Sequence, residues 1–281
     1  MSQTAGSRTA DPSSALPPLR EVIARHDLGA RRSLGQHFLL DGNVTAQIVR
    51  EAEPLTGNHV IEVGPGPGGL TRALLASDAA SVTVIEIDHR AVAAMRELAE
   101  AVGRRLHVVQ ADALKVNLPA LVPAPRAVVA NLPYNIASPL LVGWLRQAAA
   151  FERLTLMFQQ EVADRICAPP GSEAYGRLGV LVQWVCEARI ALRLPPSAFV
   201  PAPKVWSAVV RLVPRALQPP PELFNRMERV TAAAFGQRRK MLRGALKSLG
   251  GEMLLTRADI DGERRAETLS VAEFDRLARC L

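Results

Sequence analysis

Residues 59–69 read HVIEVGPGPGG, and this stretch decides the fold. The run from His59 to Gly64 is typical of a buried strand, and the glycines after it are typical of a tight loop. Glycine lets a backbone turn sharply and lets a ligand approach closely, and a helix expected from Leu70 adds the positive end of its dipole. The order strand, glycine loop, helix therefore predicts a nucleotide-binding edge in an open α/β sheet.

The same alternation continues along the chain to residue 159. Further strands are expected at 81–88, 106–112, 127–131 and 154–159, and helices at 70–77, 91–102 and 138–150. The strand runs are continuously apolar, which is typical of strands that are buried on both faces. The alternation predicts a parallel sheet with helices on both sides.

The pattern changes after about residue 176. Residues 178–194 and 206–213 are two long β-rich runs, which predict a hairpin-like pair closing the sheet edge. Pro214 and the prolines at 219–221 mark a linker, and helical spacing of apolar residues follows. We expect a disordered tail over 1–18, an α/β domain over 19–214 and a small all-helical domain over 222–281.

Composition excludes several classes of protein. The chain has 281 residues, of which 48% are hydrophobic and 22% charged, as in an ordinary globular protein of about two domains. Three widely spaced cysteines argue against a disulfide framework or a zinc site and favour a cytoplasmic location. The five histidines show no metal spacing, and prolines and asparagines interrupt the charge-free run 127–145. We expect no metal, no membrane segment and a monomer.

The formal net charge is +7, and part of it is concentrated near the C-terminus. Residues 231–250 carry five basic side chains and no Asp or Glu: Arg238, Arg239, Lys240, Arg243 and Lys247. Such a patch indicates a polyanionic partner, with a solvated helix face as the alternative.

Two carboxylates at strand ends complete a candidate cofactor site. Glu86 ends the strand after the glycine loop, where an acid can accept both ribose hydroxyls of a nucleoside. Asp112 ends the next strand, where it can accept from an adenine amino group or cap the following helix. The glycines match the G-x-G-x-x-G pattern of NAD sites, and they fit S-adenosylmethionine (SAM) as well.

The sequence Asn131-Leu-Pro-Tyr134 follows the fourth strand and is expected beside the glycine loop. An adenine amine is a poor nucleophile because its lone pair is delocalised into the ring. The Asn131 oxygen and a backbone carbonyl near Pro133 can accept its two N–H bonds and hold it for attack on a methyl group. Tyr134 offers a stacking face for a flipped-out base. Hydride transfer has no use for this motif, which favours SAM over NAD; an ordinary turn is the alternative.

Seven motifs in order resemble those of the rRNA adenine dimethyltransferases, most closely the small-subunit type. They are LGQHFL at 34–39, VIEVGPG at 60–66, VIEID at 84–88, NLPYNIAS at 131–138, FQQEVA at 158–163, FVPAPKV at 199–205 and FGQRRK at 235–240. The resemblance covers most of the chain from about Ser33. It implies a class I SAM-dependent methyltransferase fold, Rossmann-like, with a seven-stranded and mostly parallel sheet.

The resemblance also implies an activity and the residues for it. Methyl groups would pass from SAM to the N6 amines of two adjacent adenosines near the 3′ end of small-subunit (16S) rRNA, giving N6,N6-dimethyladenosines late in ribosome biogenesis. The basic C-terminal segment would contact that rRNA. The residues implied at the cofactor are Gln36, His37, Leu39, Gly64, Gly66, Glu86, Asp112 and Asn131. Those implied at the target base are Asn131, Leu132, Pro133, Tyr134 and Phe199.

Two of these positions are open to another interpretation. His37 stands where Asn is commonest in the family, although His can still form a hydrogen bond. Phe199 would stack on the target adenine by resemblance, whereas the sequence alone predicts a core aromatic.

Three other functions share parts of this pattern. A large-subunit rRNA adenine methyltransferase of the antibiotic-resistance type has the same chemistry, but the motifs at 135–140 and 199–205 favour the small-subunit enzyme. A protein glutamine methyltransferase uses a similar Asn-Pro-Pro-Tyr turn, which Leu132 and the basic segment argue against. A non-catalytic RNA-binding assembly factor would have lost site residues, and here only His37 departs from the pattern.

Overall fold

The computed structural model describes residues 16–29, 37–237 and 239–281. The predicted tail over 1–18 lies almost wholly outside the described residues, as do Gln36 and Arg238. From Pro17 on, the chain contacts the body of the protein, because the Pro17 carbonyl accepts a hydrogen bond of 2.7 Å from Arg72.

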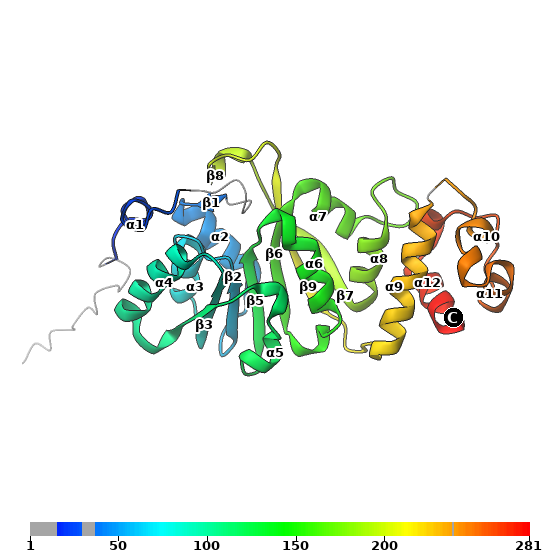
Figure 1. Cartoon of the computed structure of the whole chain (residues 1–281), viewed down its shortest axis with the longest axis horizontal. Coiled ribbons are helices and arrows are strands. Elements are labelled where there is room, and N and C mark those ends of the chain that lie inside the picture. The colour runs from blue at the N-terminus through cyan, green and yellow to red at the C-terminus, as the bar shows by residue number, and fades with distance from the viewer. Residues whose placement is uncertain (1–15, 30–36, 238) are drawn as a thin grey trace, which may run out of the picture.

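A seven-stranded sheet forms the centre of the molecule (Figure 1). Its strand order is β4-β3-β2-β5-β6-β9-β7. The first five strands of that order run parallel, and β9 is antiparallel to both of its neighbours. The bounds are β2 His59–Val63, β3 Ser81–Glu86, β4 Leu106–Gln110, β5 Arg126–Asn131, β6 Arg153–Gln159, β7 Cys186–Leu194 and β9 Ser207–Pro214. The predicted class I fold and the antiparallel pair at the sheet edge are confirmed.

Helices cover both faces of the sheet. One hydrophobic cluster includes α1 (Leu19–Arg25), α2 (Gly42–Ala52), α3 (Gly69–Leu75) and α4 (His89–Val102). The other includes α5 (Leu118–Leu121), α6 (Tyr134–Leu145), α7 (Gln160–Cys167) and α8 (Arg177–Val185). Strand side chains alternate between the two, so that Val60 belongs to the first cluster and Ile61 to the second. This double burial is why the central strands β2, β3, β5 and β6 are mostly apolar.

The prediction of one β-rich run over 178–194 was wrong in its first half. Residues Arg177–Val185 form α8, and only Cys186–Leu194 form a strand. A short apolar run does not by itself distinguish a buried helix from a buried strand. Here Gly179 matters, because a side chain at this position would come within 3.0 Å of the Arg165 carbonyl of α7. Close helix–helix packing therefore decides the conformation.

The helix predicted over 138–150 also differs from the structure. α6 begins at Tyr134, directly after Pro133, and ends at Leu145. Pro139 lies inside the helix, although Ser138-Pro139 looks like a helix start in the sequence. As a result, Tyr134 occupies the first turn of α6 at the carboxyl end of β5.

A small two-stranded sheet joins the N-terminal segment to a distant loop. β1 (Phe38–Leu39) pairs with β8 (Phe199–Val200) in antiparallel register, Phe38 opposite Val200 and Leu39 opposite Phe199. The His37 ring adds a hydrogen bond of 2.7 Å from Nδ1 to the Pro201 carbonyl. These contacts hold residues 37–39 above the glycine loop.

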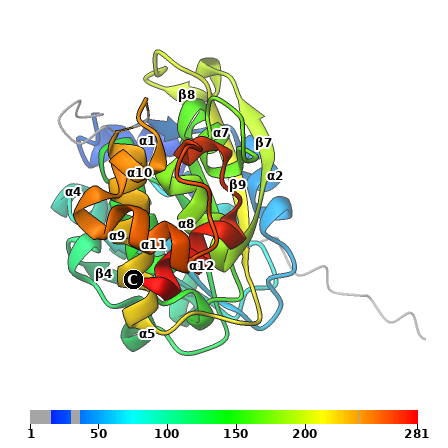
Figure 2. The same ribbon diagram turned by 90° about the vertical axis from the view of Figure 1, so that its right-hand side faces the viewer.

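The C-terminal residues are helical, and they pack against α8 beyond the β7 edge (Figure 2). The helices are α9 Pro221–Gly236, α10 Leu242–Ala245, α11 Gly251–Arg257 and α12 Val271–Cys280. Phe224 and Phe274 belong to the same hydrophobic cluster as α8. Residues 215–220 between β9 and α9 match the predicted linker. That the helical part is a separate domain stays a prediction, because it shares this core with the α/β part.

Candidate functional site

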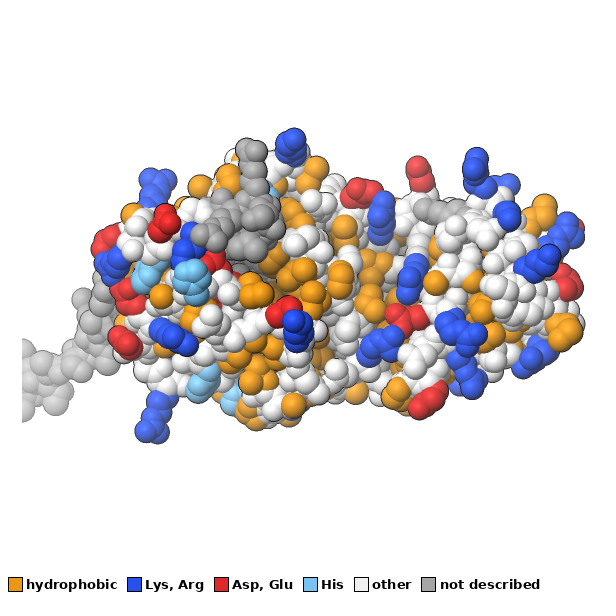
Figure 3. Space-filling view, in the orientation of Figure 1, with side chains coloured by type: hydrophobic (Ala, Val, Ile, Leu, Met, Phe, Trp, Pro, Cys, Tyr) orange, Lys and Arg blue, Asp and Glu red, His pale blue; other side chains and the backbone are white. Residues whose placement is uncertain are grey.

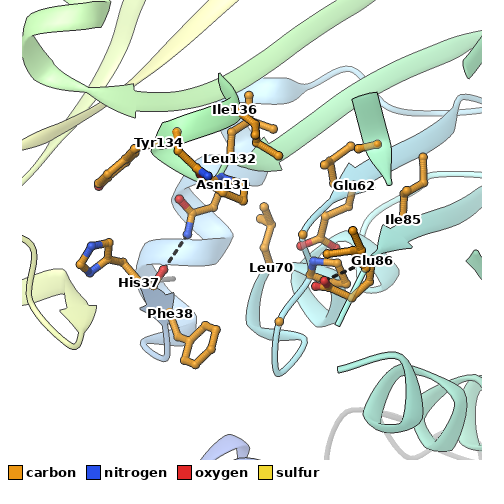
Figure 4. A pocket seen from close by; sticks show the side chains of 18 of the residues that line it. His37, Phe38, Glu62, Leu70, Ile85, Glu86, Asn131, Leu132, Tyr134 and Ile136 are labelled. Atoms are coloured by element: carbon orange, nitrogen blue, oxygen red, sulfur yellow. Dashed lines mark hydrogen bonds between the residues drawn. The ribbon is translucent and has the colours of Figure 1, made fainter. Parts of the chain in front are cut away.

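A cavity of about 300 Å³ opens at the carboxyl ends of β2, β3, β4 and β5 (Figure 4). This is the place where connections leave the sheet in opposite directions, and ligands bind there in open α/β sheets. The structure brings most of the predicted site residues to its wall, namely His37, Leu39, Gly64, Gly66, Glu86, Asp112, Asn131, Leu132, Pro133 and Tyr134. Residues that are up to 97 positions apart therefore line one pocket.

The glycine loop needs glycine for two separate reasons. Gly64 and Gly66 have φ values of +71° and +53°, in the left-handed region that side chains disfavour. In addition, a Cβ at Gly66 would lie 2.8 Å from the Phe38 ring. The loop is thus built to let the β1 segment close over it.

Glu86 presents a buried carboxylate to the cavity. Its Oε1 accepts hydrogen bonds from the backbone N–H groups of Ile87 (2.8 Å) and Asp88 (2.9 Å). Burial raises the pKa of the Glu86 carboxyl, and backbone N–H donors, including that of Gly66, act against this shift. The carboxylate is held in a fixed orientation at the point predicted for ribose hydroxyls.

Asp112 fulfils one of the two roles that the sequence left open, the cap, and its position leaves the other open. Its Oδ1 accepts a 3.0 Å hydrogen bond from the Leu114 N–H and so caps a short 3₁₀ turn at Ala113–Lys115. The same side chain lines the cavity. Capping fixes the carboxylate there, and contact with a ligand stays a prediction.

Asn131 is oriented by a residue far away in the sequence. Its Nδ2 donates a hydrogen bond of 2.9 Å to the His37 carbonyl, as Figure 4 shows. A carbonyl can only accept, so the amide nitrogen must face His37 and the Oδ1 must face away from it. The Asn131 oxygen is therefore available as an acceptor beside the cavity.

Tyr134 and His37 lie side by side next to Asn131 (Figure 4). Their ring centroids are 5.5 Å apart, and the Tyr134 hydroxyl shares a hydrogen bond of 2.6 Å with the Ser207 hydroxyl at the start of β9. Burial raises the pKa of the Tyr134 phenol. The hydrogen bond between the Tyr134 and Ser207 hydroxyls therefore fixes the Tyr134 ring near the carboxyl end of β6.

Phe199 is not among the described residues that line the cavity. Its side chain is 3% exposed and packs in the cluster around Leu39 and Leu194. Burial in β8 makes it a core aromatic here, as the sequence alone predicts. Its stacking on the target base stays a prediction.

Other residues that were not predicted also line the cavity, and four of them stand out by their chemistry. Phe38 covers Gly66, while Ile87 and Leu114 are large apolar side chains that stay 59% and 49% exposed. The fourth is Glu62, an acid in an otherwise apolar strand, and that contrast was a signal available in the sequence. The Thr71 hydroxyl donates a hydrogen bond of 2.6 Å to its Oε2.

Glu62 gives the fold a measurable pH dependence. Burial raises the pKa of its carboxyl to about 8, with the Thr71 hydrogen bond acting against burial and the Glu86 charge adding to it. The unfolded chain ionises near 4.5, so the native state holds an extra proton between about pH 4.5 and 8, and the free energy of unfolding falls as pH rises through that range.

We expect Glu62→Gln to flatten this profile. Between pH 5.5 and 8 the Glu62 contribution to the free energy of unfolding falls by at most about 3 kcal/mol, since one pKa unit corresponds to about 1.4 kcal/mol. Urea unfolding of the cofactor-free wild type and variant at pH 5.5 and 8 measures this change in the free energy of unfolding. If the free energy of unfolding changed equally with pH in both proteins, Glu62 would be ionised in the native state. Glu86 acts in the same direction in both proteins, so the difference between the two profiles reports on Glu62 together with its coupling to Glu86.

The basic C-terminal residues are exposed where the structure describes them. Arg239, Lys240, Arg243 and Lys247 lie on and around α10, and Figure 3 shows Lys and Arg side chains gathered at that end of the molecule. Glu263 lies 3.5 Å from Arg243, so this basic residue is partly neutralised by an acid outside 231–250.

The described residues form neither a metal site nor a membrane span. No group of His, Cys, Asp or Glu there has a metal-binding arrangement. Within the same residues, none of the helices has the length and apolar character that a membrane span requires. The three cysteines, all described, are unpaired.

Comparison with known proteins gives consistent matches. The family model "Ribosomal RNA adenine dimethylase" matches residues 28–281. The chain is similar to two proteins named "Ribosomal RNA small subunit methyltransferase A". The protein of Gluconobacter oxydans is 62% identical, over 94% of this chain and 87% of the length of that protein. That of Paramagnetospirillum magneticum is 59% identical over 95% of each.

Solved structures agree with the sequence matches. A dimethyladenosine transferase from Plasmodium falciparum has a TM-score of 0.73 at 27% identity, covering 86% of this chain and 96% of that one. The 23S rRNA methyltransferase ErmE has a TM-score of 0.65 at 29% identity, covering 87% of this chain and 99% of that one.

Proposed function

The chain belongs to the ribosomal RNA adenine dimethylase family, and from that premise we propose how its own residues perform the reaction. It is a methyltransferase that acts on small-subunit (16S) rRNA and dimethylates adenines at N6. The methyl donor in this proposal is SAM, and the targets are two adjacent adenosines near the 3′ end, modified late in ribosome biogenesis.

The orientation of Asn131 is the observation that carries the chemistry. Because Nδ2 of Asn131 donates a hydrogen bond to the His37 carbonyl, its Oδ1 is the atom that accepts a hydrogen bond from one N–H of the target amine. The Pro133 carbonyl already accepts from the Ile136 N–H at 3.1 Å, which favours the Leu132 carbonyl as the second acceptor. Two acceptors hold the amine in place and raise its electron density. Tyr134 stacks on the base, and its bond to Ser207 keeps the ring in place.

The residues of the cavity wall support SAM as the methyl donor by their chemistry. About 300 Å³ is at the lower end of the range for small-molecule sites. Glu86 would accept the ribose hydroxyls and Asp112 the adenine amino group, between the apolar side chains of Ile87 and Leu114. Gly64 and Gly66 would contact the methionine part, beneath Leu39. When bound, SAM supplies an electrophilic methyl group on a sulfonium.

The exposed basic residues and the unpaired cysteines indicate the partner and the compartment of the enzyme. The basic residues Arg239, Lys240, Arg243 and Lys247 contact rRNA phosphates, because exposed cations displace the counterions that are condensed on a polyanion. The unpaired cysteines suit the reducing cytoplasm. We propose that the enzyme acts there as a monomer and needs no metal ion.

Lys240 and Lys247 provide the test of the rRNA contact. We expect the double variant Lys240→Ala, Lys247→Ala to bind small subunits about tenfold more weakly at 150 mM salt, with a salt slope shallower by about 1.5. The matched control is Arg96→Ala, Arg104→Ala on α4 and the turn after it, at the other end of the sheet. Filter binding at several salt concentrations measures both. Equal losses of affinity for small subunits in the two double variants would mean that binding depends on the net charge of the protein and not on these two lysines.

Label transfer tests the substrate. The protein is incubated with methyl-labelled SAM and small ribosomal subunits lacking adenosine methylation, with large subunits and a protein extract in parallel. Label in small-subunit rRNA alone is expected. Label in large-subunit rRNA would indicate a large-subunit rRNA methyltransferase instead, and label in protein would overturn the rRNA assignment. No label with SAM binding retained would indicate a non-catalytic assembly factor.

A further inference from the structure

Trp206 is a large aromatic side chain that the fold does not bury. It stands directly before β9 and is 50% exposed, whereas Trp144 of α6 is 5% exposed. Val200 at the end of β8 and Val205 directly before Trp206 are also exposed, at 52% and 44%. Leaving an indole half in water forgoes part of its burial energy, so the exposure calls for an explanation outside the core.

The backbone of Trp206 is fixed beside the proposed target-base site. Its carbonyl accepts a hydrogen bond of 2.9 Å from the Gln160 N–H at the start of α7. The next residue, Ser207, holds the Tyr134 hydroxyl at 2.6 Å and pairs with Gln159 at the carboxyl end of β6. Consecutive Cα atoms are only about 3.8 Å apart. Trp206 is therefore one residue away from the group that positions Tyr134.

The location of Trp206 also suits a nucleic acid strand. Lys204, two residues before it, is exposed and supplies a cation for a phosphate. Figures 1 and 2 show β8 and the C-terminal end of α9, after which the basic residues follow, toward the upper side of the molecule. The loop 201–206 comes close to the cavity, because Ser207 directly after it bonds to Tyr134 of the cavity wall. We therefore place this loop on the path of a strand that joins the cavity to those basic residues.

We propose that the indole of Trp206 is a stacking platform for the nucleobase directly adjacent to the target adenine in the rRNA. The inference rests on the proposed function and adds a second base contact to it. An adenine drawn out of its stack leaves its neighbour without a stacking partner, and an exposed aromatic face replaces that partner. Any base has such a face, so this contact holds the strand without reading its sequence.

Kinetics on unmethylated small ribosomal subunits test the proposal with three variants. Trp206→Ala and Trp206→Leu should each raise KM about tenfold, the range expected for losing one base–aromatic stack, while Trp206→Phe stays within threefold of the wild type. Leucine keeps apolar bulk without an aromatic face, so the Leu and Phe variants separate stacking from packing. Leu217→Ala is the control, because this residue is 89% exposed beyond the opposite end of β9 and should change nothing.

The affinity for SAM, measured by calorimetry, should be the same in all four variants. Trp206→Leu with the KM of the wild type would overturn the proposal, and so would equal KM values for the Leu and Phe variants. A wild-type protein that labels no rRNA would instead overturn the proposed function, which keeps the two failures apart.

Discussion

Replacing Asn131 with alanine is expected to lower kcat for methyl transfer by at least about 100-fold. Removing one preoriented hydrogen-bonding group from a reaction centre costs about 10²–10³ in rate. The variant loses the Oδ1 acceptor for the target amine and also the 2.9 Å bond from Nδ2 to the His37 carbonyl. Affinity for small subunits should stay within about twofold, because the basic C-terminal residues are untouched. Single-turnover label transfer and filter binding measure the two quantities.

Asn117→Ala is the control for the Asn131 substitution. Asn117 precedes α5 and makes no side-chain capping bond, so its removal should leave both quantities unchanged. A loss of rRNA affinity as large as the loss of rate in Asn131→Ala would contradict the role of Asn131. So would a loss of rate below tenfold.

The second large effect is expected at Gly69, the first residue of α3. An added Cβ there would lie well under 3.0 Å from the backbone carbonyl oxygen of Leu39. Neither partner can move freely, because α3 packs in the core and Leu39 is paired with Phe199 in the β1–β8 sheet. Gly69→Ala should therefore push the β1 segment off the glycine loop. We expect the Kd for SAM to rise about 30-fold, since overpacking a tight contact costs about 1–3 kcal/mol.

Gly143→Ala is the matched control for Gly69→Ala. Gly143 is an exposed helical residue of α6 with nothing within 4 Å of an added Cβ. The substitution should leave SAM affinity unchanged and raise the free energy of unfolding by about 0.5–1 kcal/mol, because alanine favours a helix interior. Calorimetric titration and urea unfolding of both variants test this. Similar SAM affinities in the two variants would show that the β1 segment does not cover the cofactor.

The α/β core was predictable because its pattern is local. The strands are short apolar runs bounded by glycine and acid residues, and their order follows from alternation with helices. The same local logic failed over 178–185, where an apolar stretch became α8 through its contact with α7. Periodicity alone does not encode which neighbour such a stretch will meet.

The site was predictable in its residues and less so in its geometry. Glu86, Asp112 and Asn131 come to one cavity because the carboxyl ends of parallel strands share an edge. The orientation of the Asn131 amide depends on a backbone carbonyl 94 residues away, and no local pattern contains it. Glu62 was overlooked because it stands inside the strand, where an acid is rare unless it is protonated or paired.

The central claim is that Asn131, Leu132 and Tyr134 present an exocyclic adenine amine for two successive methyl transfers. The most direct test digests labelled small-subunit rRNA to nucleosides after reaction with the wild-type protein and separates them by mass. The account predicts that the label is in N6,N6-dimethyladenosine, at two adjacent positions near the 3′ end. Label on a ring nitrogen, on a ribose hydroxyl or on another base would contradict it.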